Sequence, residues 1–373
     1  MYFNLENVIT RINEYAWEID TEKINIMEVC GTHTNSIAKY GIGNVISNKI
    51  NLLSGPGCPV CVTNEEYIDA AIYLASKDNI IITFGDLMKV KGSNSTLSIE
   101  KSKGRNIQII YSIADVIDIA KMHYPRDVVF LSIGFETTAP LIASLIKETY
   151  IQGIKNLFFL TSIKIMPPIL EKIISTKNKN IHGIICPGNV SVITGECKFK
   201  FIYEKYNVPA VICGFEEKDI LAGIYFLLRN IYRKDNNINE YGFKNLYRRW
   251  VSGSGNKKAQ EIIKDVFEIG DAVWRGIGNI EKSGLTINRK YCFLDAVNKF
   301  NLHENIKEKN YKIKNKCRCT EVLLGSINPY ECELFNNSCT PDNPQGACMV
   351  SREGSCAVHY KYSAQIFKYS GGK

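Results

Sequence analysis

Short apolar runs rich in β-branched residues recur along the first 215 residues, each separated from the next by a stretch long enough for a helix. The runs are INIMEV (24–29), INLLS (50–54), NIIITFG (79–85), IQIIY (107–111), VVFLSI (128–133), LFFLT (157–161), GIICP (183–187) and PAVICGF (209–215). Continuous apolar runs of this length are typical of buried parallel strands in βαβ units. The sequence therefore predicts an α/β fold with parallel sheets.

The predicted strands also repeat at a nearly constant offset. Starts at 24, 50, 79 and 107 are followed by starts at 128, 157, 183 and 209, which lie 102 to 107 residues later. The first run of each set ends in a similar turn, EVCGTHTNSIA and SIGFETTAPLIA. We infer two similar parallel-sheet α/β domains, residues 20–122 and 123–225, facing a cleft. The alternative is that any alternation of strand and helix gives similar periods by chance.

After about residue 220 the pattern changes. Helical periodicity dominates residues 218–234 and 257–278, and the last 57 residues hold six cysteines. We expect residues 226–373 to form a third, helical and cysteine-rich domain, with the N-terminal helix 1–19 packed on it. Its regular structure alone would bury little, so we expect a metal centre to supply part of its stability.

Composition and charge narrow the class of protein. The chain is 45% apolar and 23% charged, and no apolar run approaches the roughly 20 residues that a bilayer span requires. The N-terminus carries acids early and lacks the form of a secretory signal, so we expect a cytoplasmic protein with no membrane partner. The net charge of +8 is diffuse, and its densest stretch is 307–319. No RNA-binding or helix-turn-helix motif accompanies it, so we do not expect a nucleic-acid partner.

The 13 cysteines are informative because structural disulfides rarely persist in a reducing cytosol. Six of them lie in the tail, and these are Cys317, Cys319, Cys332, Cys339, Cys348 and Cys356. With such wide spacings they can converge only if a bound metal or another link holds them together. Four thiolates suit zinc or an iron–sulfur cluster. The spacing is not that of a zinc ribbon, and a cluster beside a redox-active pair accounts for all six. The pattern therefore favours iron–sulfur over zinc.

The stretch MEVCGTHT (27–34) carries Cys30 to the carboxyl end of a predicted strand, where open α/β sheets bind ligands. A cysteine near a helix N-terminus can have its thiolate stabilised by the helix dipole and by a neighbouring imidazole. His33 then orients a ligand, moves a proton or binds metal directly. A packed turn cysteine with a capping threonine is the alternative.

The stretch GPGCPVC (55–61) places Cys58 and Cys61 at a helix start after the second predicted strand. This arrangement typically lowers a thiol pKa and permits disulfide exchange. Because it belongs to the same sheet edge as Cys30, we expect three thiols to converge there. They would bind a late transition metal, or Cys58 and Cys61 would be oxidised together.

The stretch GFETTAP (134–140) ends the equivalent strand of the second repeat, with Glu136 near the position of Cys30. Glu136 is either a hydrogen-bonding or proton-transfer group facing the cleft or a capping acid. In CPGNVS (186–191), Cys186 is as easily a core residue as a ligand, and Cys197, Cys213 and Cys292 are expected to be inert.

These motifs, with CPGNVSVI and the tail PxxCxLFxNxCTPxxPxGACMVSxEGSCAVxYKY, together resemble the HypD family of NiFe-hydrogenase maturation proteins over residues 27–362. The resemblance implies an assembly scaffold with redox activity rather than an enzyme. It implies a HypC-type chaperone as partner and an iron that receives two cyanides and one carbon monoxide, the Fe(CN)2CO group. HypE would deliver the cyanides, supplied by HypF, and the hydrogenase large subunit would receive the finished group. The family is also similar to ferredoxin:thioredoxin reductase, in which a 4Fe-4S cluster lies beside a disulfide.

Carried over by motif, the resemblance assigns each cysteine a role. Cys30 would bind the iron, and Cys58 and Cys61 would form a nearby redox pair that ligates iron in some states. The 4Fe-4S cluster would be held by Cys317, Cys332, Cys339 and Cys356, leaving Cys319 and Cys348 as a second thiol pair.

Thr32, His33 and Glu136 would bond to cyanide nitrogens or move protons. We expect the cluster and the thiol pairs to deliver electrons to the iron. The alternative functions are a cluster-fed thiol–disulfide oxidoreductase and a protein whose tail is only a structural zinc site.

Overall fold

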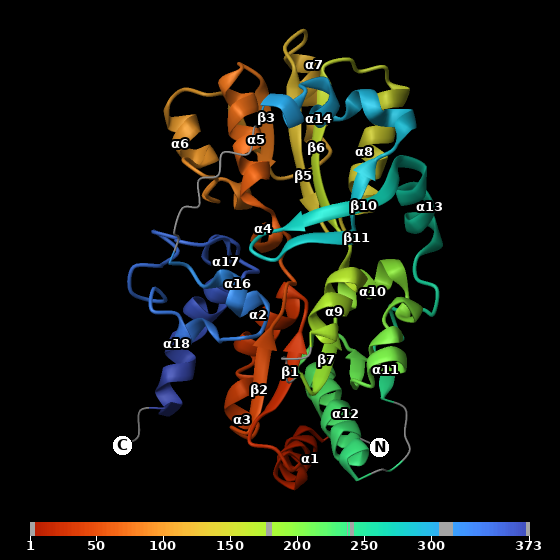
Figure 1. Ribbon diagram of the computed structural model, residues 1–373, viewed down its shortest axis with the longest axis vertical. Helices are drawn as coiled ribbons and strands as arrows, with labels where there is room; N and C mark the ends of the chain where they lie inside the picture. Colours follow the sequence, from red (N-terminus) through yellow and green to blue (C-terminus); the bar gives the residue numbers. More distant parts are fainter. Residues whose placement is uncertain (1–3, 177–180, 237, 239–241, 306–315, 371–373) are drawn as a thin grey trace.

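The structure is a computed structural model that describes residues 4–176, 181–236, 238, 242–305 and 316–370 of the chain (Figure 1). Each of the eight predicted strands is present and begins at the start of its apolar run or one residue later. They are β1 (Ile24–Glu28), β2 (Ile50–Ser54), β3 (Ile80–Phe84), β4 (Ile107–Ile110), β5 (Val128–Gly134), β6 (Leu157–Lys164), β7 (Gly183–Cys186) and β8 (Ala210–Ile212). The predicted α/β class is confirmed.

The strands form two sheets, which lie one above the other in Figure 1. The five-stranded sheet has the order β2-β1-β7-β8-β9, is parallel throughout and ends with β9 (Phe243–Asn245). The six-stranded sheet has the order β10-β11-β6-β5-β3-β4. Four of its strands are parallel, whereas β10 (Phe267–Trp274) and β11 (Gly278–Ile287) form an antiparallel hairpin at one edge.

The sheets do not follow the expected ranges 20–122 and 123–225, because each range contributes two strands to each sheet. The inferred repeat is nevertheless visible in the strand order. The constant offset pairs β1 with β5, β2 with β6, β3 with β7 and β4 with β8. When each strand of the order β2-β1-β7-β8 in one sheet is replaced by its counterpart, the result is β6-β5-β3-β4, which is the order in the other sheet. Each sheet thus combines the first half of one repeat with the second half of the other.

Eighteen helices connect and cover the strands in the described residues. They are α1 (Leu5–Glu18), α2 (Gly31–Lys39), α3 (Ile42–Val45), α4 (Pro59–Val62), α5 (Glu65–Ser76), α6 (Leu97–Ser102), α7 (Asp115–Met122), α8 (Ala139–Ile151), α9 (Met166–Ser175), α10 (Gly188–Thr194), α11 (Phe201–Tyr206), α12 (Glu217–Asp235), α13 (Lys257–Val266), α14 (Ala296–Lys299), α15 (Leu302–Asn305), α16 (Cys319–Leu323), α17 (Ala347–Val350) and α18 (Ser355–Ser370). The largest apolar core includes one side of each sheet, and smaller cores lie under α1 and α12 and under α7, α8 and α13.

Residues 226–373 do not form the separate helical domain that was expected. Strand β9 completes the five-stranded sheet, and the hairpin β10–β11 completes the six-stranded one. The predicted helix over 257–278 ends at Val266 and continues as strand β10. The N-terminal helix α1 packs on α12 and on the five-stranded sheet, so the second half of α12 supplies its expected contact with residues 226–373.

The cysteine-rich segment lies beside α2 and α4, in blue in Figure 1. In its described part the helices α16 and α17 are one turn long, and α18 packs on α2. The lysine-rich stretch 307–319 falls outside the described residues up to 315. None of the helices in the described part of the chain is long and apolar enough to cross a membrane.

Candidate functional site

The carboxyl ends of β1, β5, β6 and β7 meet at one crevice between the two sheets, with a volume of about 220 Å³. The cysteine-rich segment closes one side of it through Glu353. Besides Glu353, the polar and sulfur-bearing residues in its lining are Cys30, Thr32, Thr137, Thr138, Met166 and Asn189. Strand ends of parallel sheets are the usual position of ligand sites, so the crevice is the candidate site.

Cys30 and the GPGCPVC loop are in direct backbone contact. The Gly31 amide donates to the Gly57 carbonyl at 3.2 Å, and a side chain at Gly57 would overlap the backbone of Cys30. A side chain at Gly31 would collide with Glu353, at 2.7 Å from its Cβ and its carbonyl oxygen. The glycines therefore bring the first strand end, the CxxC loop and the cysteine-rich segment together. The contact of the CxxC loop with Cys30 was predicted, but Cys58 and Cys61 themselves are not among the residues that line the crevice.

The Cys30 thiol is almost fully buried beside a buried acid. Glu28 accepts hydrogen bonds from the Cys30 amide at 2.9 Å and from the Thr34 hydroxyl, and burial raises its pKa to about 7. Burial, and then the Glu28 charge, raise the pKa of the Cys30 thiol to about 12. The expected stabilisation of a thiolate by the helix start is thus outweighed by desolvation. A metal cation would have to displace the thiol proton.

His33 does not line the crevice. Its ring is fully buried, with Nε2 3.1 Å from the Gly214 carbonyl oxygen and the ring 4.5 Å from that of Phe215. Burial lowers the pKa of His33 to about 4, so the ring is neutral. The side chain holds α2 against the loop after β8, whereas its neighbour Thr32 faces the crevice.

Glu136 lies directly behind the crevice wall formed by Phe135 and Thr137. It is buried, its Oε1 accepts from the Met166 amide at 2.9 Å, and its Oε2 has no hydrogen-bond partner. Burial raises the pKa of Glu136 to about 7. Glu136 therefore caps the start of α9, whose first residue is Met166, and it does not cap α8, which has no side-chain cap hydrogen bond.

Cys58 and Cys61 are buried free thiols at the two ends of the first turn of α4. The Cys61 amide donates to the Cys58 Sγ at 3.3 Å. Burial raises the pKa of the Cys61 thiol well above its usual range, which is opposite to the expected lowering at a helix start. The Cys61 Sγ lies 3.9 Å from the Ala347 carbonyl oxygen, so this pair contacts the cysteine-rich segment directly.

Cys319 and Cys348 form a disulfide that joins α16 to α17, with their Cα atoms 6.3 Å apart. They are the two tail cysteines that the family resemblance left as a thiol pair. Cys348 follows Ala347, the residue that contacts Cys61. The disulfide is therefore next to the CxxC pair.

The remaining tail cysteines are grouped. Burial raises the pKa of the Cys356 thiol, and the charges of Cys317, Cys339 and Cys332 each raise it further, which requires the four thiols to be neighbours. The Ser355 hydroxyl beside them is buried without a partner. A side chain at Gly346 would overlap the Cys317 sulfur, so the backbone there leaves room next to it.

Within the described residues no three His, Cys, Asp or Glu side chains are arranged to hold a single metal ion. Four grouped cysteines with a buried donor that lacks a partner nevertheless fit a larger iron–sulfur cluster, whose ligands bind different irons. Among the other cysteines, Cys186 and Cys213 are buried in the apolar cores, Cys197 is exposed and Cys292 is half-buried. The burial of Cys186 agrees with its interpretation as a core residue.

Asn189 and Glu353 line the crevice but were not among the predicted site residues. Asn189 reaches Thr32 across the crevice, with its Nδ2 3.5 Å from the Thr32 Oγ1. Its position after a predicted strand was the available signal. Glu353 comes from the cysteine-rich segment, and burial raises its pKa. Nothing in the local pattern around Glu353 indicated that it would reach a strand end more than 300 residues away.

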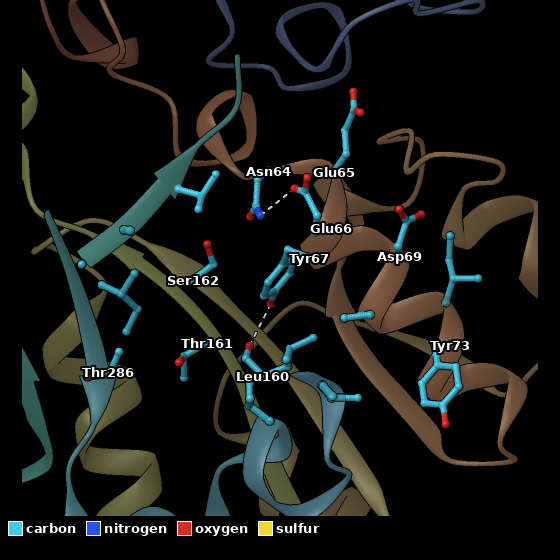
Figure 2. A pocket seen from close by; sticks show the side chains of 18 of the residues that line it. Asn64, Glu65, Glu66, Tyr67, Asp69, Tyr73, Leu160, Thr161, Ser162 and Thr286 are labelled. Carbon is cyan, nitrogen blue, oxygen red and sulfur yellow. Dashed lines mark hydrogen bonds between the residues drawn. The ribbon is translucent and has the colours of Figure 1, made fainter. Parts of the chain in front are cut away.

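A larger hollow of about 1120 Å³ lies between α5, β6 and the hairpin β10–β11. Figure 2 shows its centre, where the Tyr67 hydroxyl donates to the Leu160 carbonyl at 2.8 Å. The acids Glu65, Glu66 and Asp69 line the side formed by α5. None of the candidate cysteines lines this hollow, so it is separate from the crevice.

The fold and the site define a class of protein: a two-sheet α/β protein whose cysteine motifs converge at the strand ends. The family model HypD, described as the hydrogenase formation hypA family, matches residues 4–363. The chain is 39% identical to a putative hydrogenase expression/formation protein of Methanocaldococcus jannaschii, covering 96% of this chain and 97% of that protein. It is 36% identical to the hydrogenase maturation factor HypD of Escherichia coli, covering 92% and 90%. The chain therefore belongs to the HypD family, as its motifs indicated.

Proposed function

We propose that the protein is a hydrogenase maturation scaffold that, with a HypC-type chaperone, holds the iron on which the Fe(CN)2CO group is assembled. The observation that supports this most is the convergence of three cysteine sets. The thiol of Cys30 opens into the crevice, Gly57 of the CxxC loop contacts its backbone, and Glu353 of the cysteine-rich segment closes it.

The crevice suits a small anionic iron group as cargo. Cys30 is the thiol in its lining, and thiolates are suitable anchors for iron. Thr32, Thr138 and Asn189 offer hydroxyl and amide donors for cyanide nitrogens. Glu136 holds a proton behind the wall, since its pKa is close to neutrality and one of its oxygens is free of partners.

The sulfur-bearing segments form a continuous series from the tail to Cys30. The series runs from Cys317 to the disulfide Cys319–Cys348, then through Ala347 to Cys61 and Cys58, and through Gly57 to Cys30. In thiol–disulfide exchange, the Cys58 and Cys61 thiols become a disulfide while Cys319 and Cys348 become thiols. Two electrons and two protons pass from the Cys58–Cys61 pair to the Cys319–Cys348 pair, so no outside oxidant or reductant is needed.

A 4Fe-4S cluster on Cys317, Cys332, Cys339 and Cys356 would supply single electrons when bound. The partners we propose are a HypC-type chaperone at the crevice, HypE as cyanide donor with HypF upstream, and the hydrogenase large subunit as acceptor. A second thiol from a partner protein would approach Cys30 through the crevice, because Cys30 is otherwise buried.

Infrared spectroscopy of the anaerobically isolated protein with its small chaperone tests this function. We expect bands of metal-bound cyanide and carbon monoxide in the wild type and in Cys197→Ser, because Cys197 is exposed and outside the crevice. We expect Cys30→Ser to lose these bands while the protein stays folded. Bands of unchanged strength in Cys30→Ser would show that the iron is held elsewhere.

A thiol–disulfide oxidoreductase fed by the cluster is the second candidate, and the disulfide Cys319–Cys348 next to the CxxC pair favours it. Such an enzyme should reduce protein disulfides repeatedly without any chaperone, given an electron donor. Turnover under these conditions, together with absent infrared bands, would favour the oxidoreductase over the scaffold.

A further inference from the structure

The tip of the β10–β11 hairpin leaves its sheet and inserts between two cysteine-bearing helices (Figure 1). On one side, Trp274 bridges to Thr63, and the Arg275 amide donates to the Val62 carbonyl at 2.9 Å, directly after Cys61. On the other side, Gly276 approaches Thr320 of α16 so closely that a side chain there would overlap the threonine. Thr320 is the neighbour of Cys319. The tip therefore touches both redox elements.

The Arg275 side chain is fixed in one orientation. Its Nε donates to the Thr63 carbonyl at 2.6 Å, and its Nη2 donates to the Lys91 carbonyl at 3.2 Å. Its Nη1 pairs with Glu65 at 3.1 Å, at the edge of the hollow shown in Figure 2. The side chain is only 14% exposed, whereas Glu65 is 44% exposed. Every nitrogen of the guanidinium is therefore engaged, and a nearly buried cation is held by a partner that solvent screens.

Arg275 lies where two sulfur-bearing elements meet. Its amide is hydrogen-bonded to Val62, the residue after Cys61, and the next residue, Gly276, touches Thr320, which follows Cys319 and lies three residues after Cys317. A fixed positive charge is therefore present at the junction of the CxxC helix with the segment that carries the grouped tail cysteines. In a poorly hydrated interior such a charge interacts with its neighbours much more strongly than in water.

We propose that Arg275 is a positioning residue that holds a fixed positive charge between the CxxC helix and the cluster cysteines and thereby favours the reduced cluster. The proposal rests on the proposed function, because it requires the cluster. Reduction adds one negative charge to a cluster, so a neighbouring cation stabilises the reduced state more than the oxidised state. The three hydrogen bonds of this side chain go to Thr63, Glu65 and Lys91, so they hold the guanidinium beside the CxxC helix.

An anaerobic optical redox titration of the cluster-loaded full chain tests the proposal. We expect Arg275→Gln to shift the one-electron equilibrium about tenfold toward the oxidised cluster. This corresponds to a midpoint potential lower by about 59 mV. Arg275→Lys keeps the charge and should shift it by less than about threefold. Glu65→Gln removes the opposing charge and should shift the equilibrium in the other direction.

Arg318→Gln is the matched control. Arg318 lies beside Cys332 in the same segment, but it is more exposed than Arg275 and is already paired twice with Glu321, at 2.9 and 2.6 Å. We expect less than about a threefold change for it. If Arg275→Gln does not retain its cluster, Arg275→Lys and Glu65→Gln still decide the matter, since the proposal requires a small shift in the first and an opposite shift in the second.

The outcomes separate this proposal from the proposed function. A wild-type protein that binds no cluster would contradict both. A cluster that titrates identically in the wild type, Arg275→Gln and Glu65→Gln would overturn only the role of Arg275. Equal shifts in Arg275→Lys and Arg275→Gln would also overturn it, because the effect would then depend on the guanidinium hydrogen bonds and not on the charge.

Discussion

Glu136 is a buried carboxyl group with one hydrogen bond and one oxygen without a partner. In the folded protein its pKa is raised to about 7 from an ordinary value of 4.5. The folded state therefore keeps the proton at pH values where the unfolded chain has lost it. Stability from this group is fully present below about pH 4.5 and is lost as the pH rises through about 7.

We expect Glu136→Gln to remove this loss, because the amide keeps the shape of the protonated acid and does not ionise. Relative to the wild type, the variant should gain up to about 3 kcal/mol in unfolding free energy between pH 5 and pH 8. Urea unfolding at both pH values measures it.

Glu100→Gln serves as the control of opposite sign. Lys103 lowers the pKa of Glu100, so this carboxylate stabilises the fold at neutral pH and its removal should destabilise the protein there. A pH dependence of Glu136→Gln identical to that of the wild type would show that Glu136 is ionised in the fold.

The site residues that could be predicted are those whose residue type and position in a motif indicate a chemical role. Cys30, Cys58 and Cys61 follow strand ends at one sheet edge, so the contact between the CxxC loop and Cys30 followed from topology. The state of the thiols did not, because helix starts lower a thiol pKa only where desolvation is weak, and here burial dominates for Cys30 and Cys61. Arg275 carried no signal, since its role depends on a hairpin tip that packs across the chain.

At the scale of elements, the predicted strands were confirmed because most of the apolar runs are buried on both sides, as in parallel sheets generally. The edge strand β4 is the exception, because its Ile109 is exposed. The hairpin was missed. The spacing of the apolar residues after α13 continues its helical period, and these residues are Val266, Phe267, Gly270, Val273 and Trp274. The exposed Ile269 and Val273 also hide the alternation expected of a strand, because β10 lies at the sheet edge.

The one-turn helices α16 and α17 are too short to be stable by themselves. On the proposed function, four cysteines bound to a cluster hold them in addition to the disulfide. We expect removal of the iron by an anaerobic chelator to accelerate amide hydrogen exchange about tenfold or more across residues 317–356, since a lost constraint lowers the local opening free energy. Exchange in β1, β5 and β7 should not change. Mass spectrometry of the exchanged peptides measures both.

The sheet peptides are the internal control of that experiment, because their strands are held by ladder hydrogen bonds and apolar cores. Equal exchange in residues 317–356 before and after chelation would mean that the segment is stable without iron. Such a result would mean that the disulfide Cys319–Cys348 and the packing of the segment stabilise it without a cluster.

At the scale of the whole molecule, the repeat was visible in the sequence but the exchange of its halves was not. An offset of about one hundred residues says which strands are equivalent, yet it carries no information on which sheet a strand enters. That choice is made at the connections through α4 and α5 and through α9, which lead from one sheet to the other. The exchange places the ends of β1 and β7 opposite those of β5 and β6, and so it builds the crevice.

The exchange also determines how the chain can be divided. In a fragment of residues 1–122, β1 would keep β2 but lose β7, and β3 would keep β4 but lose β5. Pairs of strands are marginally stable at best, and the apolar faces that both sheets share would be exposed to water. We expect neither 1–122 nor 123–373 alone to give a cooperative urea transition by circular dichroism. Mixed in equal amounts during refolding, the two fragments should recover one. A cooperative transition of 1–122 alone would show that a single repeat folds as a unit, with β3 and β4 taking the places of β7 and β8.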